Sequence, residues 1–199
     1  MEEEWKFEVA DVLVLNALAE APLPAGAVAG PLSRVDLKNC YLDTNDRILS
    51  RAREAFRWRS SADGREWLTL KAHHRREGAF HRMDEWECRV ENFDLKAPWR
   101  SAGAPVDQLT ARVGRVPLEV VVEFRTERRS RRIDGFGGYA TLALDRTQWA
   151  DGVEFAELEL ELGSGAPEPW AAWVEELGVR WDLKPSTRTK LARALERPA

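Results

Sequence analysis

The chain has 199 residues, of which 44% are hydrophobic and 32% are charged, as expected for one soluble globular domain with somewhat more charge than average. Its 30 basic and 34 acidic residues give a formal net charge of −4, which argues against a general nucleic-acid-binding protein, because such proteins normally have a basic excess. Cys40 and Cys88 form no paired motif. The acidic start at Glu2-Glu3-Glu4 and the lack of a long apolar run argue against a signal peptide and a membrane span. We therefore expect a single cytoplasmic domain over residues 1–199.

The first part of the chain predicts a strand, a helix and a second strand. Residues 2–7 alternate between polar and apolar side chains, whereas residues 9–19 have apolar side chains at helical spacing. Prolines and glycines predict a loop over residues 22–31. A strand pattern returns at residues 35–42 and ends in the turn-forming residues 43–46.

The middle of the chain predicts a meander of short strands. They cover residues 55–60, 66–72 and 84–90, with a turn at Asp63-Gly64, a polar loop at residues 75–78 and a short helix at residues 106–113. His73, His74 and His81 lack the spacing of a zinc motif, so we expect them to lie in a surface loop.

The second half of the chain returns to strand patterns and ends in helices. The strands are expected at residues 118–124, 128–133, 140–144 and 155–162, followed by a helix around residues 170–177 and a last helix with Ser186 as its N-cap. About eight or nine short strands are enough for a closed antiparallel barrel, in which no strand edge is left unpaired. The pattern therefore predicts an α+β protein that is mainly antiparallel β.

Charged side chains share one face of several expected strands. Glu2, Glu4 and Lys6 fall on one face of the first strand, opposite Trp5 and Phe7. The other charged faces consist of Glu157, Glu159 and Glu161; of Arg57 and Arg59; of Thr69 and Lys71; and of Arg128, Ser130 and Arg132. One such strand is more often a solvated outer face than a binding site. Several acidic and basic faces in one chain favour a shared polar interior.

Acidic and basic rows together suit a polyphosphate site. Rows of carboxylates repel one another unless a cation neutralises them. Carboxylate oxygens are the usual ligands of Mg²⁺ and Mn²⁺, which share their remaining coordination with substrate phosphates. Arginine and lysine bind phosphate oxygens, and the planar arginine fork does so with two hydrogen bonds.

An ordered set of motifs resembles the CYTH, or triphosphate tunnel, superfamily. Glu2-Glu3-Glu4-Trp5-Lys6 matches the ExExK pattern that opens CYTH domains. The motifs that follow in family order are Tyr41-Leu42-Asp43-Thr44, Phe56-Arg57-Trp58-Arg59, Leu68-Thr69-Leu70-Lys71, Glu85-Trp86-Glu87, the Arg128 strand, Leu142-Ala143-Leu144-Asp145-Arg146, Phe155 to Leu162, and Lys184-Pro185-Ser186 with Lys190. The resemblance spans nearly the whole chain.

The resemblance implies a fold and roles for individual residues. The implied fold is a closed eight-stranded, tunnel-like β-barrel with a polar, charged interior and flanking helices. The implied metal ligands, for Mg²⁺ or Mn²⁺, are Glu2, Glu4, Asp145, Glu157, Glu159 and Glu161. The implied phosphate-binding residues are Lys6, Arg57, Arg59, Lys71, Arg128, Lys184 and Lys190. The implied catalytic residues are Lys6, Arg57, Arg59, Lys71, Glu85, Glu87 and Asp145.

The activity that this resemblance implies is metal-dependent hydrolysis of the terminal phosphoanhydride of a small-molecule triphosphate. Inorganic tripolyphosphate ranks first because no segment is identifiable as a base-recognition module. Thiamine triphosphatase and class IV adenylyl cyclase activities are alternatives, and a non-catalytic polyphosphate- or nucleotide-binding module is an alternative of another class. We expect no nucleic-acid or membrane partner, and a monomer or homodimer.

Overall fold

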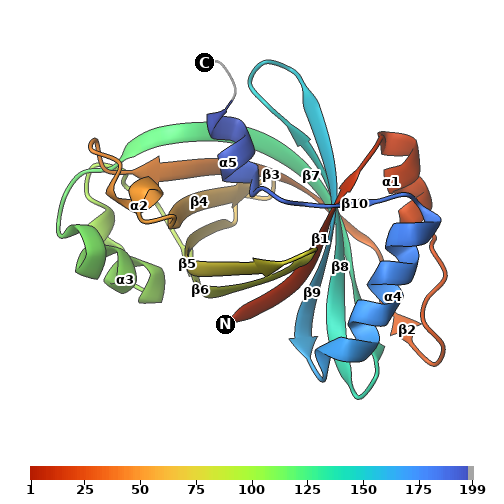
Figure 1. Ribbon diagram of the computed structural model, residues 1–199. Coiled ribbons are helices and arrows are strands. Elements are labelled where there is room, and N and C mark those ends of the chain that lie inside the picture. The colour runs from red at the N-terminus through yellow and green to blue at the C-terminus, as the bar shows by residue number, and fades with distance from the viewer. Residues whose placement is uncertain (197–199) are drawn as a thin grey trace.

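A single antiparallel β-sheet dominates the structure and closes on itself into a barrel (Figure 1). The computed structural model describes residues 1–196, so the last three residues of the expected domain lie outside the described part. Within that part, eight strands follow one another in the order β1-β6-β5-β4-β3-β7-β8-β9, and β9 pairs with β1 to complete the ring. The predicted eight-stranded antiparallel barrel with flanking helices is confirmed.

The secondary-structure elements follow the predicted order with different boundaries. The strands are β1 (Glu2–Val9), β2 (Val28–Ala29), β3 (Ser33–Asp43), β4 (Ala55–Ser61), β5 (Glu66–Glu77), β6 (Phe80–Val90), β7 (Glu119–Gly135), β8 (Gly138–Gln148), β9 (Glu154–Ser164) and β10 (Lys184–Pro185). The helices are α1 (Val12–Ala19), α2 (Ile48–Arg51), the 3₁₀ turn η1 (Pro98–Arg100), α3 (Ala104–Val113), α4 (Pro167–Arg180) and α5 (Lys190–Leu195). None of the helices in residues 1–196 is both long enough and apolar enough to cross a bilayer.

The barrel wall separates an apolar outside from a polar inside. On one side, α1 and α4 cover the outer faces of β1, β8 and β9, where Leu158, Leu160 and Trp170 are fully buried (Figure 1). On the opposite side, α3 packs on β5 and β6, and a second apolar cluster forms around Phe56 and Leu70. Since successive strand residues point to opposite faces, burying the apolar set outside the barrel turns the charged set inward.

The expected loop at residues 75–78 is wrong, because β5 and β6 continue as one long hairpin that turns at Gly78 and Ala79. A polar composition indicated a loop there, but pairing between the two strands keeps the polar residues extended. The three histidines therefore lie in strands, and His81 is only 1% exposed. The prediction of a loop is wrong, and the prediction of a surface position holds for His73 and His74 but not for His81.

Two other boundaries differ from expectation. The two strands expected at residues 118–124 and 128–133 form one 17-residue strand, β7, because β3 and β8 pair with it on either side through the intervening charged residues. The last helix begins after Thr189, whose hydroxyl accepts a hydrogen bond from the Ala192 amide, so Ser186 is not its N-cap. The Ser186 hydroxyl instead donates to Glu157.

The apolar layer between β9 and the helices predicts a large contrast between two Leu→Ala substitutions. Leu160 is fully buried there, whereas Leu13 on α1 is 77% exposed. We expect Leu160→Ala to lower the free energy of unfolding by about 2–5 kcal/mol, since it removes buried methyl groups and leaves a cavity. Leu13→Ala should change it by less than about 0.5 kcal/mol. Urea unfolding measures both, and equal effects would contradict the outer core described here.

Candidate functional site

The inward-facing side chains surround a cavity of about 610 Å³ inside the barrel. Most of the residues that the sequence predicted for a site line this cavity, although they come from seven strands and a helix. They are Glu2, Glu4, Lys6, Arg57, Arg59, Lys71, Glu85, Glu87, Arg128, Asp145, Glu159, Glu161 and Lys190. The register places opposite charges on directly paired positions of neighbouring strands: Lys6 opposite Glu159, Lys71 opposite Glu85, and Arg128 opposite Asp145. Such cross-strand pairs stabilise a sheet.

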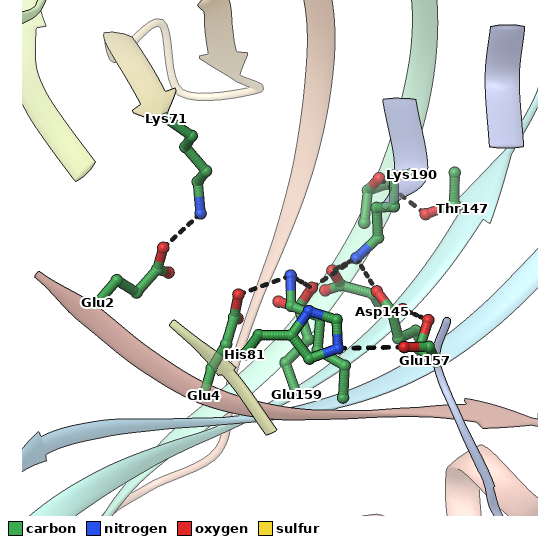
Figure 2. Close-up of polar contacts among 12 residues, drawn as sticks. Glu2, Glu4, Lys71, His81, Asp145, Thr147, Glu157, Glu159 and Lys190 are labelled. Carbon is green, nitrogen blue, oxygen red and sulfur yellow. Dashed lines mark hydrogen bonds and ion pairs between the residues drawn. The ribbon is translucent and has the colours of Figure 1, made fainter. Parts of the chain in front are cut away.

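Lys190 is the centre of the most densely charged part of the cavity (Figure 2). It is the first residue of α5, and its ammonium group lies 2.9 Å from Asp145, 2.5 Å from Glu157 and 2.8 Å from Glu159. The lysine side chain is only 12% exposed. Three carboxylates around one ammonium group leave excess negative charge, so further cations are needed nearby.

Arg128 and Lys6 supply those further cations. Arg128 binds Asp145 through two hydrogen bonds of 2.7 Å and also donates to Glu159. Lys6 lies 2.8 Å from Glu4 and 3.2 Å from Glu159. Burial raises the pKa of Glu159, but Lys190, Lys6 and Arg128 outweigh burial and hold this pKa well below its usual range. Glu159 is therefore ionised at neutral pH.

A second charged group lies toward the start of β1. Lys71 binds Glu2 at 2.7 Å (Figure 2), and it also binds Glu85 at 3.1 Å. Arg57 donates to the Thr69 hydroxyl at 3.1 Å. Each of these basic groups thus has an acidic or polar partner inside the tunnel.

Arg59 differs from the other buried cations because no carboxylate within residues 1–196 pairs with it. Its one side-chain hydrogen bond goes to the Asn39 amide oxygen, at 2.9 Å. Burial, together with the neighbouring Arg57 and Arg128, lowers its pKa to about 9. Burial raises the pKa of the Tyr41 hydroxyl, but Arg57 and Arg59, together with Lys71 and Lys190, outweigh burial and lower this pKa. Arg57, Arg59 and Arg128 thus form a cationic wall of the cavity, in which Arg59 alone lacks a carboxylate partner among the described residues.

The carboxylates at the start of β1 and the end of β9 show the opposite imbalance. Burial raises the pKa of Glu4 more than Lys6 lowers it. Partial burial, together with Glu2 and Glu4, raises the pKa of Glu161 to about 7. Crowded carboxylates of this kind fit a hard divalent cation. In the conformation seen, no three acidic, histidine or cysteine side chains of residues 1–196 are arranged to hold a metal, because lysines lie among the carboxylates.

Two predicted site residues do not line the cavity. Lys184 is exposed and binds Asp182, because β10 pairs with the last residues of β1, beyond the part of β1 that lines the cavity. The prediction that it binds phosphate is not supported. Glu157 is buried behind Lys190 and hydrogen-bonded to Ser186, so its carboxylate is already occupied on both oxygens. It holds Lys190 and is not placed as a metal ligand.

Sequence reasoning missed several polar residues of the cavity wall, and four of them lie in the strands of the barrel. They are Asn39, Tyr41, Thr126 and His74. Tyr41 could have been predicted from the sequence, because it belongs to the Tyr41-Leu42-Asp43-Thr44 motif and has the same strand parity as Asn39. His74 could not, since an extra residue in β5 changes its parity.

Two lysines near the C-terminus provide a matched pair for testing this geometry. Lys190→Met leaves three buried carboxylates short of a cation, so we expect the free energy of unfolding to fall by about 3–5 kcal/mol. Lys184→Met removes an exposed pair and should change it by less than about 0.5 kcal/mol. Denaturant unfolding at neutral pH is the measurement, and a neutral Lys190→Met would show that the ammonium group is not buried among carboxylates.

Comparisons with known proteins agree on the fold. The CYTH domain model matches residues 1–195, and no functionally curated protein matches significantly. Similar solved structures include HpAC1 from Hippeastrum, a proposed adenylyl cyclase described as having a dominant triphosphatase activity (18% identity, 96% of this chain and 94% of that chain, TM-score 0.73). Others are a proposed adenylate cyclase from Bacillus halodurans (19%, 97% and 98%, 0.66) and PH1819 from Pyrococcus horikoshii (18%, 98% and 99%, 0.59). CYTH proteins are usually triphosphatases or cyclases that use divalent metals. The chain therefore belongs to the CYTH domain family.

Proposed function

We propose that this protein hydrolyses the terminal phosphoanhydride of a triphosphate, with inorganic tripolyphosphate as the preferred substrate. Water attacks the terminal phosphorus, the bond to the bridging oxygen breaks, and pyrophosphate and phosphate are released. The main support is the buried guanidinium of Arg59, which has neighbouring cations and no acidic partner in the described residues. A buried cation without a partner is unfavourable unless a ligand supplies the opposite charge.

The roles of the basic residues follow from their positions. Arg57, Arg59 and Arg128 face the cavity with planar forks that suit phosphate oxygens. Lys6, Lys71 and Lys190 neutralise further negative charge. As charge develops on the transferred group and the leaving oxygen, these fixed cations stabilise it without reorganising. The Tyr41 hydroxyl lies in the same cationic wall and donates a hydrogen bond to the substrate.

The acidic residues have two proposed roles. Glu2, Glu4, Glu159, Glu161 and Asp145 would hold the divalent metal, either Mg²⁺ or Mn²⁺, because oxygen ligands of this type suit both ions. A bound metal supplies positive charge beside the phosphate oxygens. Glu85 and Glu87, on the neighbouring strand, orient the attacking water.

The near balance of charge in the tunnel favours substrate and metal entering together. Seven basic and eight acidic side chains line the cavity, counted over the described residues. A bare polyphosphate gains little net attraction from such a lining, since each lysine that turns to it leaves a carboxylate unpaired. The carboxylates that the lysines release would be free to hold a divalent metal, whose positive charge would offset this penalty.

Organic triphosphates are the alternative substrates. The cavity is lined on the α5 side by Leu191, Ala192 and Leu195, which offer an apolar surface beside the charged groups. A thiamine or adenosine group would need such a surface. Inorganic tripolyphosphate ranks first because no further segment of the described chain is shaped around a base.

A phosphate-release assay tests the proposed reaction directly. Tripolyphosphate, thiamine triphosphate and ATP are each incubated with Mg²⁺, with Mn²⁺ or with a chelator, and ATP reactions are also analysed for cyclic AMP. We expect phosphate from tripolyphosphate with metal, none with chelator, and no cyclic AMP. Cyclic AMP as the main product would overturn the reaction type. Tripolyphosphate binding without any release would favour the non-catalytic binding module.

Substitution of Arg59 separates activity from stability. Arg59→Met removes an unpaired buried cation, so we expect the free energy of unfolding without ligand to stay constant or rise. The value of kcat/KM for tripolyphosphate should fall about 10²–10³-fold, as for the loss of one donor to a charge that forms in the transition state. Arg34→Met, at an exposed pair with Glu127, is the control and should leave both quantities unchanged. Full activity of Arg59→Met would contradict the proposed clamp.

A further inference from the structure

A β-bulge in β5 places a solvent-exposed histidine, His74, at the wall of the cavity. Ala72 pairs with Asp84 and Arg75 with Arg82, so β5 has one residue more than β6 between these pairs. His73 adopts a left-handed backbone conformation there, with φ 54°, and its exposed ring binds Asp84. Bulges re-aim side chains, and a non-glycine residue at positive φ is uncommon. The result is that the next residue, His74, lines the cavity.

His74 and His81 form a hydrogen-bonded pair with defined tautomers. His81 Nε2 lies 3.1 Å from the Ser186 carbonyl oxygen, which only accepts, so Nε2 has the proton. In neutral His81, Nδ1 then accepts from His74 Nε2, at 2.8 Å. The two rings also stack, with centroids 4.9 Å apart. Two rings in series therefore link the cavity wall to the Ser186 backbone.

Ser186 connects this pair to Lys190. Its amide donates to the Lys6 carbonyl oxygen at 2.9 Å, and its hydroxyl donates to Glu157 Oε1 at 2.7 Å. The other oxygen of Glu157 binds the Lys190 ammonium group (Figure 2). Ser186 is fully buried, and it lies in the segment that crosses from β10 to α5.

We propose that the His74–His81 pair is a positioning device that fixes the Ser186 carbonyl, and through Ser186 and Glu157 sets the Lys190 ammonium group in the tunnel. Its effect on catalysis rests on the proposed role of Lys190 in phosphate binding. Neither histidine needs to touch the substrate, since each acts through the next group in the series.

The surroundings keep the pair neutral. Burial lowers the pKa of His81 to about 4, and Lys6, His74 and Arg76 act in the same direction. Burial also lowers the pKa of His74, helped by Lys6, Arg76 and Lys71 and opposed by Glu4. Because the folded-state pKa of His81 lies below the unfolded value of 6.5, the stability that the pair contributes is present above pH 6.5. It is lost as the pH falls toward 4.

Hydrogen exchange of the ligand-free protein, followed by mass spectrometry, tests the positioning without using activity. His81→Gln keeps a donor for the Ser186 carbonyl, whereas His81→Leu removes it. We expect the amides of residues 186–192 to exchange at least tenfold faster in His81→Leu and less than threefold faster in His81→Gln. His73→Asn tolerates the same backbone conformation and is the control, with unchanged exchange. Equal protection in His81→Leu and the wild type would overturn the inference.

Two further measurements extend the test, and the first uses only the wild type, so it does not depend on whether His81→Leu folds. Histidine ¹⁵N spectra of the wild type at neutral pH should show both rings as Nε2–H tautomers, and an Nδ1–H tautomer of His81 would overturn the arrangement. Ser186→Ala breaks the link to Glu157, so tripolyphosphate affinity with Mg²⁺ should fall about tenfold, and adding His81→Leu should weaken it little more. If the losses of binding free energy from Ser186→Ala and His81→Leu were additive, the two residues would not act in series on Lys190, and the inference would be overturned. If the wild type does not bind tripolyphosphate, only the proposed function is refuted. Hydrogen exchange and the histidine tautomers would still test the positioning role of the His74–His81 pair.

Discussion

Pairing of opposite charges inside a closed barrel is the constraint on which the rest of this structure depends. Closure between β1 and β9 gives every strand an inner face, and apolar helices occupy the outer face on two sides. The charged side chains on the opposite face of each strand therefore point into the barrel. They are tolerated there because the register sets basic against acidic residues, as with Lys6 and Glu159, in positions where either charge alone would be strongly unfavourable.

Because most charged groups in the tunnel are paired, the few unpaired ones point to where a ligand binds. Arg59 has no acidic partner in the described chain, while Glu161 has acidic neighbours that raise its pKa. A fold selected for stability alone would match these groups with partners or replace them with apolar residues. The imbalance instead matches the proposed binding of a triphosphate at the Arg59 wall and of a divalent metal beside Glu161.

The last residues of the chain complete the interior that the strands begin. Lys190 comes from α5, after the chain has left the barrel through α4 and returned along β10 (Figure 1). Its ammonium group nevertheless lies at the centre of the acidic cluster. Ser186 fixes this returning segment through contacts with β1, β6 and β9. The structure therefore joins the two ends of the sequence at one site.

Strand parity predicted much of this arrangement from the sequence. Glu2, Glu4 and Glu159 face inward because alternation is strict in unbroken strands, and the ordered CYTH motifs added the family and the closed barrel. Parity failed where pairing is irregular. The bulge at His73 placed His74 at the wall of the cavity, which no local pattern indicates. Lys184 and Lys190 look alike in sequence, and only the path of the chain around β10 separates the exposed lysine from the buried one.

Calorimetric titration with a non-hydrolysable imido analogue of tripolyphosphate tests the central claim most directly. If the tunnel's cations are held by its own carboxylates, the analogue should bind at least about 100-fold more tightly with Mg²⁺ than with chelator, a coupling of about 2.7 kcal/mol. Replacing Glu4 and Glu159 together with glutamine should abolish most of that difference. Equal affinity with Mg²⁺ and with chelator would contradict the account, because it would mean that the basic residues are free to bind phosphate without any exchange of partners.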